Sequence, residues 1–183
     1  MKHIYIAILF FIYPFMLCAQ IEFDKAEQDG SRKIGSTELF IRTGFTDTKP
    51  FYYRIVAVQQ EQEIQFFLNV HINGAVPDHL NEGSLILIKT ASGDVLESKN
   101  INPEHETYDI IHKNLYGCYP FLESEIKKMA ADGISKIRIE APLNTIDIEY
   151  TDKKTKAISD GLAKRYKSIV KALSIKKDIR EGF

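Results

Sequence analysis

The chain lacks the features by which many functions are recognised. It has no tryptophan and only two cysteines, Cys18 and Cys118, in 183 residues. It contains no glycine-rich phosphate loop, no G-x-S-x-G nucleophile turn, no C-x-x-C pair and no calcium loop. These absences exclude a disulfide-rich scaffold and the enzyme classes that those motifs mark. The sequence by itself therefore defines no biochemical activity.

Long hydrophobic runs are also scarce, and only one is found. It extends from Ile4 to Leu17, follows a basic start, and contains Pro14. Its 14 residues fall short of the roughly 20 apolar residues that a membrane-spanning helix needs. The pattern is typical of a secretory signal peptide over residues 1–19. We expect a protein exported to the periplasm or the exterior, with no transmembrane span in the mature chain.

Cys18 raises the alternative of a lipid anchor. Lipoprotein processing favours a small residue before the cysteine, but here Leu17 stands there, whereas Ala19 fits an ordinary cleavage site. We therefore expect cleavage after Ala19, which makes Gln20 the new N-terminus and discards Cys18. Cys118 would then have no disulfide partner, and we expect it to be a small buried hydrophobe.

The remaining residues, 20–183, show no repeat and no linker, which favours a single domain. Their charge is uneven. Residues 151–183 hold ten Lys or Arg and four acidic residues, a net charge of +6, whereas residues 20–150 hold 13 basic and 21 acidic residues, a net charge of −8. The chain thus has an acidic body and a basic C-terminal segment.

Residues 21–100 have the pattern of strands and turns. Strands are predicted at 38–43, 51–60, 64–72, 85–90 and 95–98. In the third of these, Ile64, Phe66, Leu68, Val70 and Ile72 alternate with more polar residues, as in a half-buried antiparallel strand.

Residues 134–150 carry the clearest local signal. With residues 141–144 as a four-residue loop, Ile139 faces Ile146 and Ile137 faces Ile148 on one side of a hairpin. On the other side, basic residues face acidic ones: Arg138 faces Asp147, and Lys136 faces Glu149. We expect this charged side to be a solvated surface.

Two helices complete the prediction. Apolar residues at helical spacing, with Gly133 as a stop, predict a helix at about 120–132, and a longer amphipathic helix is predicted at about 155–175, followed by a frayed tail at 176–183. The fold class is therefore α+β: an antiparallel sheet of about six to eight strands with both helices packed on it. For the basic C-terminal helix, contact with a membrane surface is the weaker alternative to docking on the sheet.

The stretch HETYDIIH, residues 105–112, resembles the start of a zinc-protease signature, but Asp109 stands at the second ligand position. On one helix His105, Asp109 and His112 would share a face. The residues Thr107, Tyr108, Ile110 and Ile111 instead favour a strand, on which these groups lie far apart. We expect a surface loop that leads into a strand, with no metal.

Asn69 and His71 lie on the less apolar face of the strand at 64–72. Such groups most often form only the solvated face of a sheet, but they are also candidates for a binding surface. Together with His105 and Asp109, they are the candidate binding residues that the sequence offers. No catalytic residue and no cofactor is predicted.

The leader that ends in Cys-Ala-Gln and the segment GISKIRIEAP after a helix resemble those of small uncharacterised exported proteins of Gram-negative bacteria. That resemblance implies no activity and no functional residues. We expect a non-enzymatic binding or interaction module whose partner is an envelope protein or a small ligand, not a nucleic acid. The alternative is a small periplasmic hydrolase whose site assembles from distant residues such as His71, His105 and Asp109.

Overall fold

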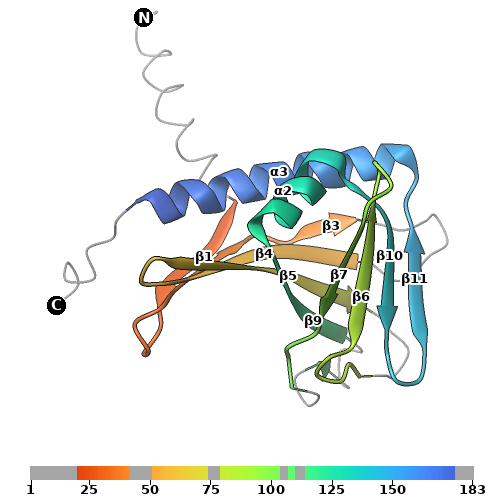
Figure 1. Ribbon diagram of the computed structural model, residues 1–183, viewed down its shortest axis with the longest axis horizontal. Coiled ribbons are helices and arrows are strands. Elements are labelled where there is room, and N and C mark those ends of the chain that lie inside the picture. Colours follow the sequence, from red (N-terminus) through yellow and green to blue (C-terminus); the bar gives the residue numbers. More distant parts are fainter. Residues whose placement is uncertain (1–19, 42–50, 74–78, 104–106, 110–113, 176–183) are drawn as a thin grey trace, which may run out of the picture.

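The computed structural model describes residues 20–41, 51–73, 79–103, 107–109 and 114–175. In these residues the chain forms eleven strands in two antiparallel sheets, together with two helices (Figure 1). This arrangement confirms the predicted α+β class. The strands are divided between a sheet of seven and a sheet of four, where the sequence predicted a single sheet.

The first sheet has the strand order β1-β2-β4-β5-β9-β8, and β3 also pairs with β4. Its strands are β1 (Ile21–Ala26), β2 (Arg32–Ser36), β3 (Leu39–Ile41), β4 (Phe51–Gln60), β5 (Glu63–Asn73), β8 (Tyr108–Asp109) and β9 (Asn114–Phe121). The predicted alternation in β5 is correct for Phe66, Leu68, Val70 and Ile72, which are buried in the core. Ile64 is 44% exposed because it lies at the end of the strand, beside the β4–β5 turn. Asn69 and His71 therefore face away from the core.

The second sheet has the strand order β11-β10-β6-β7. Its strands are β6 (Leu85–Thr90), β7 (Val95–Lys99), β10 (Ile134–Glu140) and β11 (Thr145–Glu149). The register predicted for the hairpin is confirmed: Ile139 pairs with Ile146, and Arg138 with Asp147. Ile137 and Ile139 are buried in the core, while the charged residues point outward. Hydrophobic pattern and charge pairing thus specify one register.

The two sheets meet along β9. The backbone N–H of Ile101, just after β7, donates to Cys118 O at 3.0 Å, and the N–H of Cys118 donates to Asn100 Oδ1 at 3.1 Å. The segment that follows β7 thus lies against the edge of the first sheet. This arrangement brings Asn102 close to the outer face of β5 and β9.

Helix α2 (Glu123–Asp132) begins three residues later than predicted. The reason is that Pro120 and Phe121 are the last paired residues of β9, opposite Phe67 and Phe66. The predicted stop at Gly133 is confirmed, because this residue has φ +77° and ends the helix. A side chain there would come within 2.3 Å of the Thr155 carbonyl oxygen.

Helix α3 (Asp152–Ser174) lies across the strands (Figure 1). It buries Ile158, Leu162 and Ile169 in the same core that both sheets supply. The docking of the basic helix on the sheet, as predicted, is therefore confirmed. Neither described helix combines the length and the apolar character needed to cross a membrane.

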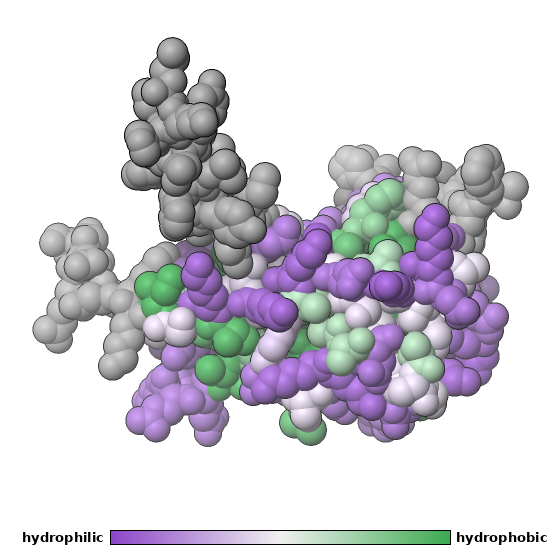
Figure 2. Space-filling model, turned by 90° about the horizontal axis from the view of Figure 1, so that it is seen from above, coloured by the Kyte–Doolittle hydropathy of each residue, from purple (hydrophilic) through white to green (hydrophobic). Residues whose placement is uncertain are grey.

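The outward face of α3 is basic. It exposes Lys153, Lys156, Lys164, Lys167 and Lys171, and Figure 2, which views the molecule from this side, shows hydrophilic side chains there with hydrophobic patches between them. The C-terminal end of α3 is held by Arg32 of β2, which donates to the carbonyl oxygens of Ala172 and Ile175, each at 3.0 Å. A carboxylate, Asp24, holds the same guanidinium at 2.9 Å. The free carbonyls of the helix end are thus satisfied by a side chain of the sheet.

Candidate functional site

A pocket of about 240 Å³ opens on the outer face of the first sheet. It is formed by outward residues of adjacent strands, because β4, β5 and β9 pair in a register that aligns them. Arg54 of β4 lies opposite Asn69 of β5, and His71 of β5 lies opposite Tyr116 of β9. The residues that line the pocket are Glu38, Arg54, Asn69, Val70, His71, Asn102, Tyr116 and Gly117.

The imidazole of His71 is held between two tyrosine rings. Tyr52 and Tyr116 are its cross-strand neighbours, with ring centroids 4.8 Å and 4.7 Å from that of His71 and interplanar angles of 17° and 22°. Tyr116 is itself fixed, because its hydroxyl accepts a hydrogen bond from Asn114 Nδ2 at 3.1 Å. Both faces of the imidazole are thus covered, so His71 can interact with a ligand only through its ring edge.

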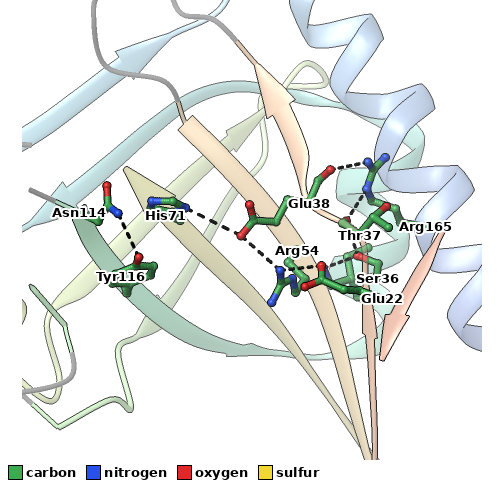
Figure 3. Close-up of polar contacts among 10 residues, drawn as sticks. Glu22, Ser36, Thr37, Glu38, Arg54, His71, Asn114, Tyr116 and Arg165 are labelled. Atoms are coloured by element: carbon green, nitrogen blue, oxygen red, sulfur yellow. Dashed lines mark hydrogen bonds and ion pairs between the residues drawn. The ribbon is translucent and has the colours of Figure 1, made fainter. Parts of the chain in front are cut away.

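Charged groups meet at one side of the pocket. Arg54 Nη2 lies 2.7 Å from Glu22 Oε2 and 3.4 Å from Glu38 Oε1 (Figure 3). His71 Nδ1 lies 3.8 Å from the same oxygen of Glu38, which is beyond hydrogen-bond distance. Glu38 therefore contacts Arg54 directly and lies near His71 without a hydrogen bond to it.

Helix α3 positions Glu38 from behind. Arg165 Nε donates to Thr37 O at 2.8 Å, and Arg165 Nη2 donates to Glu38 O at 2.7 Å (Figure 3). Burial lowers the pKa of the Arg165 guanidinium. The helix approaches closely here because it carries Gly161, where a Cβ would come within 2.6 Å of the Leu39 side chain. The conformation of the segment before β3 thus depends on α3.

Three polar atoms around this pocket are buried and have no hydrogen-bond partner within the described part of the chain. They are Arg54 Nε, Asn69 Oδ1 and His71 Nε2. The side chains of Arg54 and His71 are only 22% and 18% exposed. Since buried polar groups in folded proteins are almost always hydrogen-bonded, three unpaired atoms in one pocket need an explanation. All three atoms belong to residues that line the pocket.

The structure brings two of the four candidate residues together, because Asn69 and His71 line the same pocket. The backbone of Asp109 pairs with Asn114 at the edge of the first sheet, but its side chain is outside the described part of the chain. His105 also lies outside the described residues, as do residues 1–19 and the tail at 176–183. No group of three or more potential metal ligands occurs among the residues that the structure describes.

Sequence reasoning missed Glu38, Arg54, Asn102 and Tyr116. Arg54 had a usable signal, since a tight turn between the strands at 51–60 and 64–72 sets their register and places Arg54 opposite Asn69. Glu38, Asn102 and Tyr116 come from segments distant in sequence. No local pattern connects them with β5.

Cys118 also lies on this face of the sheet, opposite Asn69. Burial raises the pKa of its thiol to about 11, an effect that Lys33 only partly offsets. The thiol therefore stays protonated near neutral pH, which disfavours a role as a nucleophile.

A second pocket, of about 460 Å³, lies where the end of α2 meets the start of α3. Two of its polar residues, Asp132 and Ser159, have partners for their side chains. Asp132 accepts from Ser92 Oγ at 2.6 Å and lies 3.2 Å from Lys128 Nζ, and Ser159 Oγ donates to Ala130 O at 2.8 Å. None of the described residues that line this second pocket carries a buried polar atom without a partner, unlike the pocket around His71.

Comparisons with protein-family models, curated proteins and solved structures found no match to this chain. The chemistry of the site is accordingly inferred from its own residues.

Proposed function

We propose that this protein is an exported, non-enzymatic binding module that holds a small polar ligand in the pocket around His71. Three unpaired buried atoms, Arg54 Nε, Asn69 Oδ1 and His71 Nε2, carry this proposal. Each costs stability in the absence of a ligand, by roughly 1–3 kcal/mol. A ligand with matching donors and acceptors would recover that free energy on binding. The proposal of export depends on the leader at residues 1–19.

The composition of the pocket supports binding over catalysis. The lining residues that the structure describes include no serine, threonine or cysteine that His71 would activate as a nucleophile. The imidazole is held by two aromatic rings, and its Nδ1 side faces Glu38. This arrangement suits a fixed recognition group. A hydrolase with a site assembled around His71, His105 and Asp109 remains the alternative, and measurable hydrolysis of ester, peptide or glycoside substrates would favour it.

Binding can be located by nuclear magnetic resonance. The amide spectrum of the purified protein would be recorded with a panel of sugars, amino acids and small carboxylates. We expect at least one compound to shift the signals of β4, β5 and β9 selectively. His71→Phe keeps an aromatic ring between the two tyrosines but removes both ring nitrogens, so it should weaken binding by at least tenfold.

Asp160→Asn, in the second pocket between α2 and α3, is the matched control and should bind as the unchanged protein does. The proposal fails if no compound of the panel shifts the pocket signals, and turnover of a hydrolase substrate would then favour the alternative. It also fails if His71→Phe and Asp160→Asn bind equally well.

Two other partners are compatible with the sequence. One is an envelope protein, and the other is a membrane surface that α3 would contact. The exposed lysines from Lys153 to Lys171 support the second idea through their charge, and Val170, which is 39% exposed, adds an apolar side chain among them. Sedimentation with vesicles that contain anionic lipid would test it.

A further inference from the structure

We infer that the ligand of the His71 pocket is an uncharged molecule with adjacent hydroxyl groups, such as a single sugar ring or another polyol. This inference rests on the proposed function and adds the chemical class of the ligand. It follows from the charges, the hydrogen-bonding groups and the size of the pocket.

The charges of the site oppose a charged ligand. Arg54 would be the obvious group to attract an anion, but two carboxylates already occupy its Nη2, at 2.7 Å from Glu22 and 3.4 Å from Glu38. An anionic ligand would therefore meet Glu38 as well as Arg54. A cationic ligand would meet the guanidinium of Arg54, which is one of the residues that line the pocket. A neutral ligand avoids both repulsions.

The unpaired atoms of the site call for a ligand group that can both donate and accept hydrogen bonds. Arg54 Nε–H can only donate, whereas Asn69 Oδ1 and the Glu38 carboxylate can only accept. A hydroxyl group can accept from the guanidinium and donate to the amide or carboxylate oxygen. It also suits His71 Nε2, whether that nitrogen carries a proton or a lone pair. Two adjacent hydroxyls would satisfy the neighbouring groups on β4 and β5 together.

The size of the pocket limits the ligand to about one ring. Its volume of about 240 Å³ lies below the roughly 300–1,000 Å³ of sites for drug-sized ligands. It corresponds to the volume of roughly eight waters in the liquid. A single sugar unit is of this order, whereas a longer oligosaccharide would have to extend out of the pocket.

Three matched sugars test the inference. Glucose, glucuronate and glucosamine share a six-membered ring but are neutral, anionic and cationic at pH 7. With galactose and mannose as further neutral probes, each would be titrated into the purified protein while the amide signals of β4, β5 and β9 are followed. We expect a neutral sugar to bind at least tenfold more tightly than either charged one. Asn69→Leu should abolish that binding, and Asp160→Asn should leave it unchanged.

Glu38→Gln supplies an independent arm of the test. It removes one of the two carboxylates beside Arg54, so the preference should move toward glucuronate while the neutral sugar still binds. Tighter binding of carboxylates or amines than of neutral sugars at the same signals would overturn the inference and leave the proposed binding function intact. If no sugar, amino acid or carboxylate shifts these signals, the proposed function fails together with the inference.

Discussion

The β10–β11 hairpin and the strands β4, β5 and β9 both have polar outer faces, but the two faces differ in exposure and in hydrogen-bond pairing. On the β10–β11 hairpin, Arg138 binds Asp147 at 2.9 Å through both Nε and Nη2, and Lys136 Nζ lies 2.7 Å from Glu149 Oε1. These groups are exposed and paired. On β4, β5 and β9, the guanidinium, amide and imidazole groups are largely buried, and three of their atoms are unpaired.

The difference shows that polarity alone does not mark a site. The outer face of the hairpin carries more charged residues in the sequence, but its two cross-strand pairs, Arg138 with Asp147 and Lys136 with Glu149, are formed between exposed side chains. The face around His71 looks sparser, but its polar atoms are withdrawn from water without a complete set of partners. Burial combined with missing hydrogen bonds is what indicates a place for a ligand.

The inward side chains of the first sheet and of the hairpin should contribute equally to the free energy of unfolding, because both pack into one core. Leu68→Ala in β5 and Ile137→Ala in β10 should each lower the free energy of unfolding by about 2–5 kcal/mol, because each removes a fully buried side chain. Urea denaturation followed by circular dichroism would measure both. Separate transitions for the two sheets would show that the core does not join them.

Asn100 and Asn69 allow a direct comparison between an amide whose hydrogen bonds are complete and an amide whose oxygen is unpaired. Asn100 is buried and its amide is fully used: it donates to Asn81 O and Asn102 O and accepts from Cys118 N. Asn100→Leu should therefore cost about 2 kcal/mol or more, because it leaves buried partners unpaired. Asn69→Leu should instead stabilise the unliganded protein by about 1 kcal/mol, because it removes an unpaired oxygen. Thermal denaturation would compare them, and equal losses for both variants would contradict a ligand site at Asn69.

The reactivity of the Cys118 thiol measures how well the outer face of β5 and β9 is shielded from solvent. Its pKa of about 11 exceeds the ordinary value of 9.0 because burial disfavours the thiolate. The unfolded chain therefore releases this proton first, so the contribution to stability is complete below pH 9 and is lost between pH 9 and 11. In a Cys18→Ser background at pH 8, alkylation by iodoacetamide should be about 100-fold slower in the folded protein than in urea. Equal rates would show that this face is open to solvent.

Local patterns predicted most of the fold. The strand at 51–60 and the pairing of Ile139 with Ile146 follow from alternation and short turns, which act between near neighbours. The start of α2 was placed too early, at residue 120, because pairing of Pro120 and Phe121 with β5 outweighed the helix signal. Tertiary pairing overrides local preference in such places.

The pocket was predictable only in part. Alternation in β5 identified Asn69 and His71 as outward residues, but it did not reveal that Tyr52 and Tyr116 cover His71. Nor did it show that Arg165 of α3 holds the backbone of Glu38 beside Arg54. These contacts join segments far apart in sequence, so their geometry depends on the packing of the whole sheet against α3.

The smallest effect is expected on the hairpin. Arg138→Ala, Asp147→Ala and the double variant should all unfold close to the unchanged protein, because both side chains lie in solvent, where an ion pair adds little to stability. Any coupling between the two residues should also disappear in 1 M salt, since screening acts fully on exposed charges. A thermodynamic double-mutant cycle from urea denaturation at low and high salt would measure this. A large, salt-resistant coupling would mean that the paired charges of the hairpin are withdrawn from water like those around His71, and the contrast between the two faces would then rest on hydrogen-bond pairing alone.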